Sequence, residues 1–271
     1  MALGSIVWRI RERLVGPERV VLREQVRALG RANGIGGRSH LDAQLLYLRE
    51  LALGPARRAR IHVAGTTLEL GEGPNFPVDW KAFVEIFGVQ EYRAPLRDAH
   101  VLDVGAHKGY FGAFALMCGA ALVLSYEPAT TNYASLERAA HPFGARWRTR
   151  HAALGSESGT GTLHLDRTSW AHSLLTVERP AGDEIVTVVT LAEALAELPP
   201  SSARLVLKVD AEGSECDILL QPSELERVDM LMVELHPKVA PCSYDEIAAT
   251  LASAGLTPDP VTTGPLHFRR R

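Results

Sequence analysis

The stretch that decides the fold runs Val101-Leu102-Asp103-Val104-Gly105-Ala106-His107-Lys108-Gly109-Tyr110. Its first four residues form a mainly apolar run that is typical of a buried strand, and residues 110–118 continue with apolar side chains at helical spacing. Two glycines bracket the turn between them. Gly105 allows the backbone to turn tightly and to approach a ligand, while Gly109 allows close packing at the helix start. We therefore predict a strand, a ligand-binding turn and a helix.

Strands and helices alternate from this point onward. Apolar runs predict further strands at 122–126, 146–154, 205–209 and 230–235. Helices are expected around Tyr133 and after two capping boxes, Thr190 with Glu193 and Ser243 with Glu246. Residues 155–187, rich in Gly, Ser and Thr, are expected to hold short strands or a hairpin. The alternation predicts an α/β fold with a mostly parallel sheet and helices on both faces, whose ligands bind beyond the carboxyl ends of the strands.

The N-terminal part has a different pattern. Residues 1–65 are expected to form a helical extension, and residues 66–271 the main domain. Apolar side chains recur at helical spacing over 5–29, and a second helix is expected to begin at Ser39. We expect a strand at 66–70 and a short helix capped by Asp79, with Trp80, Phe83 and Phe87 on one side. The extension either forms a homodimer or covers the substrate, and the sequence does not choose between them.

Composition and charge narrow the classes of function. Apolar residues make up 46% and charged residues 23%, which is typical of a globular protein. Residues 1–97 sum to +5 and the remainder to −8, and a net-acidic second part argues against a nucleic-acid substrate. Three scattered cysteines are too few for a disulfide framework or a zinc ribbon and favour a cytoplasmic location. The uncharged run 110–126 is too short to span a membrane.

The turn itself indicates which cofactor it binds. Its spacing, Asp-x-Gly-x-x-x-Gly, differs from the Gly-x-Gly-x-x-Gly of dinucleotide-binding folds. S-adenosylmethionine has no phosphate and carries a cationic amino-acid end, which Asp103 suits. Glu127 ends the second strand, 22 residues after Gly105, where a carboxylate can accept both ribose hydroxyls. An NAD-dependent oxidoreductase is the alternative, since Glu127 would serve NAD equally well.

Four segments resemble the FkbM-type S-adenosylmethionine-dependent methyltransferases, and they are residues 101–110, 126–128, 207–215 and 233–236. The stretch at 83–87 and Glu91-Tyr92 are also similar to that family, so the resemblance covers roughly residues 66–238. It implies a class I methyltransferase fold, with a seven-stranded sheet whose final strand is reversed, and transfer of methyl to a hydroxyl of a sugar, glycolipid or secondary metabolite. Two departures stand out. His107 replaces the family's usual Asn, and Thr190-Leu191-Ala192-Glu193 replaces its Thr-Leu-Asp element.

We expect the cofactor to be bound by Tyr92, Asp103, Gly105, His107, Gly109, Glu127 and Ala153. A hydroxyl acceptor has a high pKa, so a base or a metal ion must act as the new bond forms. Asp210 and Glu212 follow one predicted strand, Glu234 and His236 follow the next, and these four side chains converge if the two strands are neighbours. Asp210 and His236 are the candidate catalytic residues, and either could be the general base. Asp210, Glu234 and His236 could instead hold Mg²⁺. Alternatively, Lys208 forms a structural ion pair, Glu215 is solvated or begins a helix, and His236 only ends its strand.

Residues 155–187 are expected to fold over the substrate. Trp170, His172 and Ser173 could hold a sugar ring through an aromatic face and hydrogen bonds, or Trp170 could simply plug a hairpin. The sequence thus predicts an O-methyltransferase that acts on a hydroxylated small molecule that contains carbohydrate. A non-enzymatic cofactor-binding protein that docks a partner through its basic N-terminal helices is the further alternative.

Overall fold

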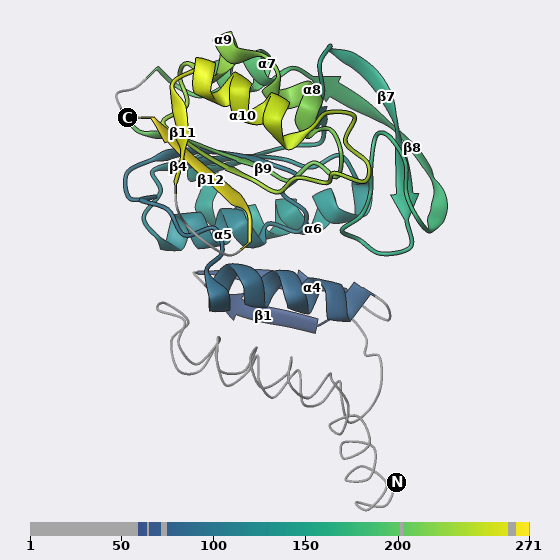
Figure 1. Cartoon of the computed structure of the whole chain (residues 1–271). Helices are drawn as coiled ribbons and strands as arrows, with labels where there is room; N and C mark the ends of the chain where they lie inside the picture. The colour runs from purple at the N-terminus through teal and green to yellow at the C-terminus, as the bar shows by residue number, and fades with distance from the viewer. Residues whose placement is uncertain (1–58, 64, 72–74, 201–202, 260–263, 271) are drawn as a thin grey trace, which may run out of the picture. The chain divides into compact units, whose positions relative to one another are not determined.

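The computed structural model describes residues 59–270, apart from residues 64, 72–74, 201–202 and 260–263 (Figure 1). The helices predicted over 5–29 and from Ser39 lie outside the described residues. The chain divides into two compact units, Met1–Gln90 and Glu91–Arg271. The predicted boundary between residues 65 and 66 falls inside the first unit.

The described part of the first unit contains a hairpin and a helix. Strands β1 (Ala59–Val63) and β2 (Thr66–Leu70) pair antiparallel, and α4 (Asn75–Phe83) runs on into a π-helix, η1 (Val84–Val89). The strand at 66–70 is confirmed, but the predicted cap is wrong. Asp79 lies inside the helix and accepts a hydrogen bond from the backbone N–H of Gly71. The aromatic rings on one side follow one another in contact, in the order Phe76, Trp80, Phe83 and Phe87.

The second unit is built on a seven-stranded sheet in the order β11-β12-β10-β9-β3-β4-β5. Its strands are β3 (His100–Val104), β4 (Leu122–Tyr126), β5 (Trp147–Arg150), β9 (Leu205–Val209), β10 (Met230–Val233), β11 (Leu256–Pro258) and β12 (Leu266–Arg270). The five from β10 to β5 are parallel, and β12 runs antiparallel to both neighbours. The mostly parallel sheet with a reversed final strand is confirmed.

Helices cover both faces of this sheet (Figure 1). On one face lie α5 (Tyr110–Met117) and α6 (Thr130–Ala140), which is followed by the 3-10 helix η2 (His141–Arg146). On the other face lie α7 (Leu191–Ala196), α8 (Glu215–Leu219), α9 (Pro222–Leu225) and α10 (Tyr244–Ser253). Both predicted capping boxes are confirmed at the starts of α7 and α10. Among the described residues, no helix has the length and apolar character that a membrane crossing needs.

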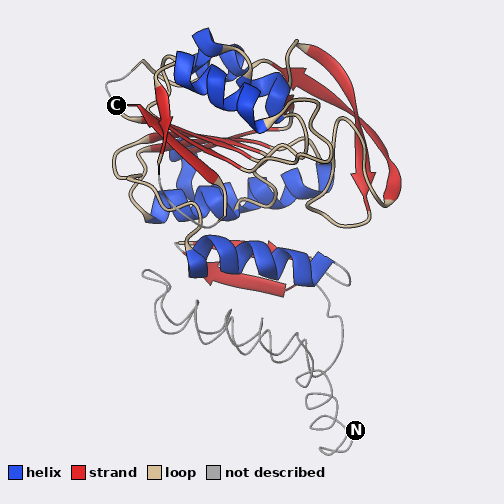
Figure 2. Cartoon of the chain, viewed as in Figure 1, coloured by secondary structure: helices blue, strands red, loops and turns tan. Residues whose placement is uncertain are grey.

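A long hairpin stands beside the main sheet (Figure 2). Its strands are β7 (Gly159–Asp166) and β8 (Pro180–Val189), which pair antiparallel. The single strand predicted over 146–154 is wrong. Only β5 belongs to the main sheet, because β6 (Ala153–Leu154) pairs with β8. The hairpin expected in residues 155–187 is confirmed, and we call its connecting residues 167–179 the cover segment.

Candidate active site

The turn after β3 lies at the centre of the sheet's carboxyl edge, because β3 is flanked by β4 and β9. The backbone N–H groups of Gly105 and Ala106 both donate to the carbonyl of Tyr126 at the end of β4. Gly105 has φ +72°, and a Cβ there would lie 1.8 Å from the backbone oxygen of Asp210. Glycine is therefore required where the ends of β3 and β9 pass one another.

Gly109 supports the start of α5. It has φ +90° and stands at the N-cap of the helix. A Cβ at this position would lie 3.0 Å from the side chains of Leu136 and Trp147. The second glycine thus allows the helix start to pack closely against its neighbours, as the spacing predicts.

Asp103 offers a buried acceptor at the turn. Its side chain is fully buried, and its Oδ2 accepts a hydrogen bond of 3.2 Å from the Ser125 hydroxyl. Among the described residues its Oδ1 has no hydrogen-bond partner, although Lys208 Nζ lies 3.5 Å away. Burial raises the pKa of Asp103, and the charge of Lys208 opposes that rise. A buried carboxylate oxygen with unused accepting capacity fits the ammonium group of an adenosyl amino acid.

Glu127 follows β4 and is held by two backbone groups. Its Oε2 accepts from the N–H of His107 at 2.8 Å, and its Oε1 accepts from the N–H of Ala129 at 3.0 Å. Burial raises the pKa of Glu127 to about 7, against the lowering effect of these hydrogen bonds. A carboxylate has about four accepting positions, and the Asn132 amide uses a third, so one position remains for a ribose hydroxyl.

The structure gives His107 a contact that its replacement of Asn did not reveal. Its ring Nε2 lies 3.0 Å from the hydroxyl of Ser169 in the cover segment. Burial, together with the charge of Lys108, lowers the pKa of His107 well below its ordinary value, so the ring is neutral. Asn132 completes a closed circuit, since its amide donates to the Ser169 carbonyl at 2.7 Å and to Glu127 at 3.4 Å. This circuit, which sequence reasoning missed, joins the Glu127 carboxylate to the cover segment.

The other two expected cofactor residues, Tyr92 and Ala153, are both buried. Tyr92 is buried beside Lys208, whose Nζ stands 5.8 Å from the ring centre, and its hydroxyl donates to Glu234 at 3.2 Å. Ala153 lies in β6 and packs in an apolar cluster with Ala129. It is therefore connected to the site through Ala129, whose N–H binds Glu127.

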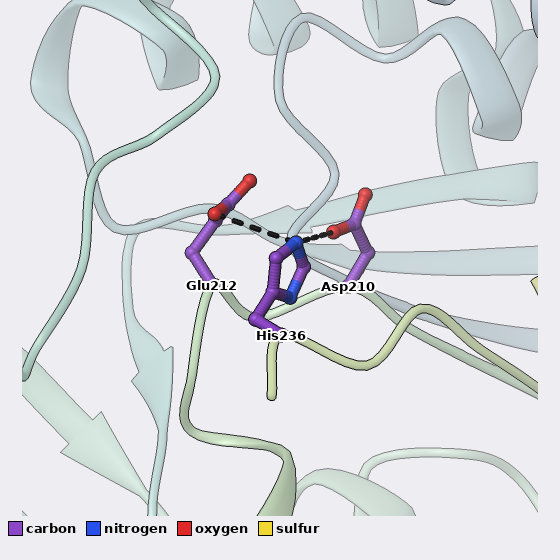
Figure 3. Close-up of side chains that lie close together, drawn as sticks. All are labelled: Asp210, Glu212 and His236. Atoms are coloured by element: carbon purple, nitrogen blue, oxygen red, sulfur yellow. Dashed lines mark ion pairs between the residues drawn. The ribbon is translucent and has the colours of Figure 1, made fainter. Parts of the chain in front are cut away.

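Asp210, Glu212 and His236 come together just beyond the ends of β9 and β10 (Figure 3). His236 Nε2 lies 3.4 Å from a carboxylate oxygen of Glu212 and 4.0 Å from one of Asp210. The two candidate catalytic residues are thus brought together as predicted, with Glu212 as a third member. One ligand atom from each of the three lies within 4.8 Å of the others. Glu234, expected in this set, binds Tyr92 instead.

Glu215 was expected to be solvated or to begin a helix. It does begin α8, but its side chain is fully buried, so the expectation of a solvated residue is wrong. It accepts hydrogen bonds from the N–H groups of Ala211 and Gly213 and from His236 Nδ1, the last at 2.9 Å. Burial by itself lowers the pKa of His236, but the hydrogen bond to Glu215 and the charges of Glu212 and Asp210 raise it to about 9.

Lys208 balances part of this negative charge. Its Nζ lies 3.5 Å from Asp103 and 3.5 Å from Asp210, and it donates to the carbonyl of Gly105 at 2.7 Å. Burial lowers the pKa of Lys208, but the charges of Asp210 and Asp103 outweigh burial and raise it. The ion pair predicted for Lys208 therefore exists. Lys208 links the turn after β3, residues 105–109, which we call the cofactor turn, to the end of β9.

The cover segment reaches the candidate catalytic residues as well as the cofactor turn. The hydroxyl of Ser173 donates to the backbone carbonyl of Glu212 at 2.6 Å. Trp170 keeps 37% of its surface exposed, so it is partly packed and partly open to solvent. His172 accepts the N–H of Asp166 at 3.0 Å, which uses one ring nitrogen for the segment's own structure. Of these three side chains, Trp170 is the most exposed.

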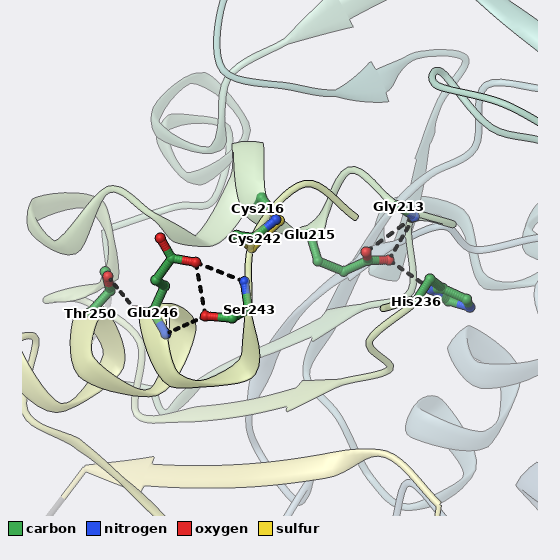
Figure 4. Close-up of a disulfide and its surroundings, with 8 residues drawn as sticks. All are labelled: Gly213, Glu215, Cys216, His236, Cys242, Ser243, Glu246 and Thr250. Carbon is green, nitrogen blue, oxygen red and sulfur yellow. Dashed lines mark hydrogen bonds and ion pairs between the residues drawn. A yellow bond between two sulfur atoms is a disulfide. The ribbon is translucent and has the colours of Figure 1, made fainter. Parts of the chain in front are cut away.

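A disulfide joins the two segments that carry Glu215 and His236 (Figure 4). It links Cys216 to Cys242, whose Cα atoms are 5.8 Å apart. The cysteine spacing gave no indication of this bond, because the two residues meet only once β9, α8 and β10 have folded. Disulfides are rare in the reducing cytosol, so the bond does not support the predicted cytoplasmic location, which stays a prediction.

Reduction of this disulfide is expected to lower the free energy of unfolding by about 3 kcal/mol, because it frees a long loop in the unfolded chain. Urea unfolding with and without dithiothreitol measures the difference. Cys118→Ser should respond to the reductant like the wild type, and a Cys216→Ser, Cys242→Ser double variant should not respond. Equal midpoints for oxidised and reduced wild-type protein would contradict the expectation.

Comparisons with known proteins agree with this geometry. Residues 103–256 match the Methyltransferase FkbM domain. Among solved structures, the chain is similar to a ribosomal protein L11 methylase from Lactobacillus delbrueckii subsp. bulgaricus (16% identity, 68% of this chain and 76% of that chain, TM-score 0.38). It is also similar to a Listeria monocytogenes protein named as an S-adenosylmethionine-dependent methyltransferase (10%, 70% and 99%, TM-score 0.41). These likenesses are too low to bear on function or substrate. A comparison with curated proteins gives no match.

The strand order, with β12 reversed beside β10, and the acidic glycine turn after β3 define a class I methyltransferase fold. The chain belongs to the FkbM methyltransferase family, whose domain spans more than half of it. It is accordingly a methyltransferase that uses S-adenosylmethionine.

Proposed function

We propose that the protein transfers the methyl group of S-adenosylmethionine to a hydroxyl of a small molecule that contains carbohydrate. The observation that carries this proposal is the position of His236. Its Nδ1 is bound to buried Glu215, and its Nε2 faces Asp210 and Glu212 beside the cofactor turn. Once it is deprotonated at Nε2, an imidazole held in this way acts as the general base that an alkyl hydroxyl acceptor needs.

The residues divide the work between binding and proton transfer. Asp103 and Glu127 are proposed to bind the amino-acid and ribose ends of the cofactor, which supplies an electrophilic methyl group. His236 Nε2 accepts the proton of the acceptor hydroxyl as the oxygen–carbon bond forms and the carbon–sulfur bond breaks. Asp210 and Glu212 stabilise the resulting imidazolium, and the proton later passes to solvent.

The cover segment supports a carbohydrate-containing acceptor. Trp170 offers a partly exposed aromatic face, and the same segment is anchored to both halves of the site through Ser169 and Ser173. A flat aromatic surface packs against the C–H face of a sugar ring, while the neighbouring carboxylates accept hydrogen bonds from its hydroxyls. The predictions of a homodimer and of a cytoplasmic location stay predictions.

Calorimetric titration with S-adenosylhomocysteine tests the cofactor assignment, with NADH as the control ligand. We expect saturable binding of S-adenosylhomocysteine and none of NADH. Glu127→Gln should weaken that binding, because the amide replaces one accepting oxygen with an NH₂ group that only donates. Binding of NADH alone would favour the oxidoreductase alternative, and binding of neither would contradict both.

A divalent metal is the alternative to an acid–base site. His236 is protonated at neutral pH in the arrangement described, so a metal would first have to displace that proton. We therefore expect dialysis against EDTA to change the methylation rate by less than about twofold, whereas loss of a catalytic Lewis acid costs several kcal/mol of barrier. Loss of activity that added Mg²⁺ restores would contradict the acid–base proposal.

A further inference from the structure

Glu215 holds two parts of the site at once. Its carboxylate accepts the N–H groups of Ala211 and Gly213, which form the turn that carries Glu212, and it also binds His236 Nδ1. The turn needs this support, because Glu212 has φ +48° and Gly213 has φ +110°, both in the left-handed region. The carboxylate is completely buried, so solvent does not compete for these hydrogen bonds.

The hydrogen bond between His236 Nδ1 and Glu215 determines whether the other ring nitrogen, Nε2, carries a lone pair. Because a carboxylate only accepts hydrogen bonds, Nδ1 must carry a proton when it faces Glu215 at 2.9 Å. In the neutral ring the lone pair is then left on Nε2, which points at Asp210 and Glu212 (Figure 3). The Cys216–Cys242 disulfide fixes the chain next to Glu215 to the segment that follows His236 (Figure 4).

We infer that Glu215 is a positioning residue, which selects the Nδ1–H form of His236 and thereby directs the basic lone pair of Nε2 toward the acceptor. This inference rests on the proposed function, in which Nε2 takes the acceptor's proton. Glu215 does not touch the reacting atoms. It acts through the ring of His236, in the way that a buried carboxylate orients the histidine of a hydrolase triad.

Glu215→Gln is the direct test, because the amide has nearly the same shape. In the wild type, Oε1 of Glu215 serves both turn N–H groups and His236 Nδ1. An amide whose oxygen takes the place of Oε1 leaves the proton on Nδ1 but removes the facing charge, and an amide turned the other way donates to Nδ1, forces the proton onto Nε2 and removes the base. We expect the limiting methylation rate at alkaline pH to fall, by at least about 100-fold where Nδ1 loses its proton, which is the usual scale for loss of general-base catalysis. We expect the pKa of His236 to fall by about one unit or more, because a facing negative charge is removed.

Nitrogen-15 NMR of the histidine rings in the complete protein measures the tautomer and pKa of His236 without any substrate. The groups that set this pKa are Glu215, Glu212, Asp210 and Glu234. Glu246→Gln is the matched control, since Glu246 also binds a helix start but is exposed and lies outside the site (Figure 4). The control should leave both the rate and the tautomer unchanged.

The outcomes separate the inference from the proposed function. The inference would be overturned if the neutral His236 ring of the wild type carried its proton on Nε2, a measurement that needs no variant to fold. It would also be overturned if the pKa of His236 were unchanged in Glu215→Gln. A changed tautomer in Glu215→Gln with an unchanged methylation rate would leave Glu215 as the residue that positions His236. It would instead contradict the proposed role of His236 as base.

Discussion

Replacement of Gly105 by alanine is expected to abolish cofactor binding and to lower stability. The new Cβ would lie 1.8 Å from the backbone oxygen of Asp210, so either the turn or the end of β9 must move. The position also has φ +72°, which costs a residue with a side chain about 1–2 kcal/mol. This movement would change the position of the cofactor turn relative to Asp210. We therefore expect the affinity for S-adenosylhomocysteine to fall at least about 100-fold, a loss of about 2.7 kcal/mol of binding free energy.

Gly65→Ala is the matched control for this variant. Gly65 also has a positive φ, +85°, but no atom lies within 4 Å of the position that its Cβ would take. It should therefore show the backbone strain without the collision and keep the affinity of the wild type. Urea unfolding measures the strain in both variants, and calorimetric titration measures the binding. Gly105→Ala protein that binds S-adenosylhomocysteine as tightly as Gly65→Ala protein would contradict the role of the turn.

The second large effect concerns the pH dependence of the rate. A base must be deprotonated before it can accept a proton, and the pKa of His236 is raised to about 9. The active fraction should therefore grow about tenfold per pH unit through the neutral range, and kcat/KM for the acceptor should level off in the alkaline range. The positive charge of the bound cofactor moves this limb somewhat below pH 9, because it disfavours the imidazolium form.

His236→Gln is expected to remove this alkaline limb and to lower the rate by about 10²- to 10⁴-fold. His164→Gln is the control. That ring also pairs with a carboxylate, since its Nδ1 lies 2.7 Å from Asp183, but it stands on the exposed side of the hairpin. Rates measured from pH 6 to 10 compare the three proteins. A rate that is independent of pH over that range, or a His236→Gln enzyme of normal activity, would contradict the assignment of His236 as base.

Much of the second unit followed from local sequence. The turn from Val104 to Gly109 and the two capping boxes are short-range features, and so the strands and helices beside them were predicted closely. The strand over 146–154 was not, because its division depends on β8 pairing with Ala153 and Leu154 from far along the chain. Asp79 failed as a cap for a related reason, since its partner is the backbone of Gly71 rather than its own helix start.

In the candidate site, too, some neighbours could be predicted from the sequence and others could not. Asp210 and His236 could be placed together because both follow the ends of parallel strands that lie next to each other. The choice of Glu212 over Glu234 as their neighbour depends on a left-handed turn and on Tyr92, which sequence spacing does not reveal. Burial of Glu215 and its contact with His236 likewise arise only after folding. The sequence feature that points to Glu215 is its place as the third carboxylate in the block Asp210-Ala211-Glu212-Gly213-Ser214-Glu215.

In the proposed function, His236 and its neighbours direct a methyl group onto a hydroxyl oxygen. Incubation with S-adenosylmethionine labelled with ¹³C in its methyl group, together with a set of hydroxylated glycosides, tests this by NMR and mass spectrometry. We expect one S-adenosylhomocysteine for each product, with the labelled carbon bonded to oxygen, and loss of that product in His236→Gln. A label found on nitrogen or carbon, or the same product yield from His236→Gln, would contradict it.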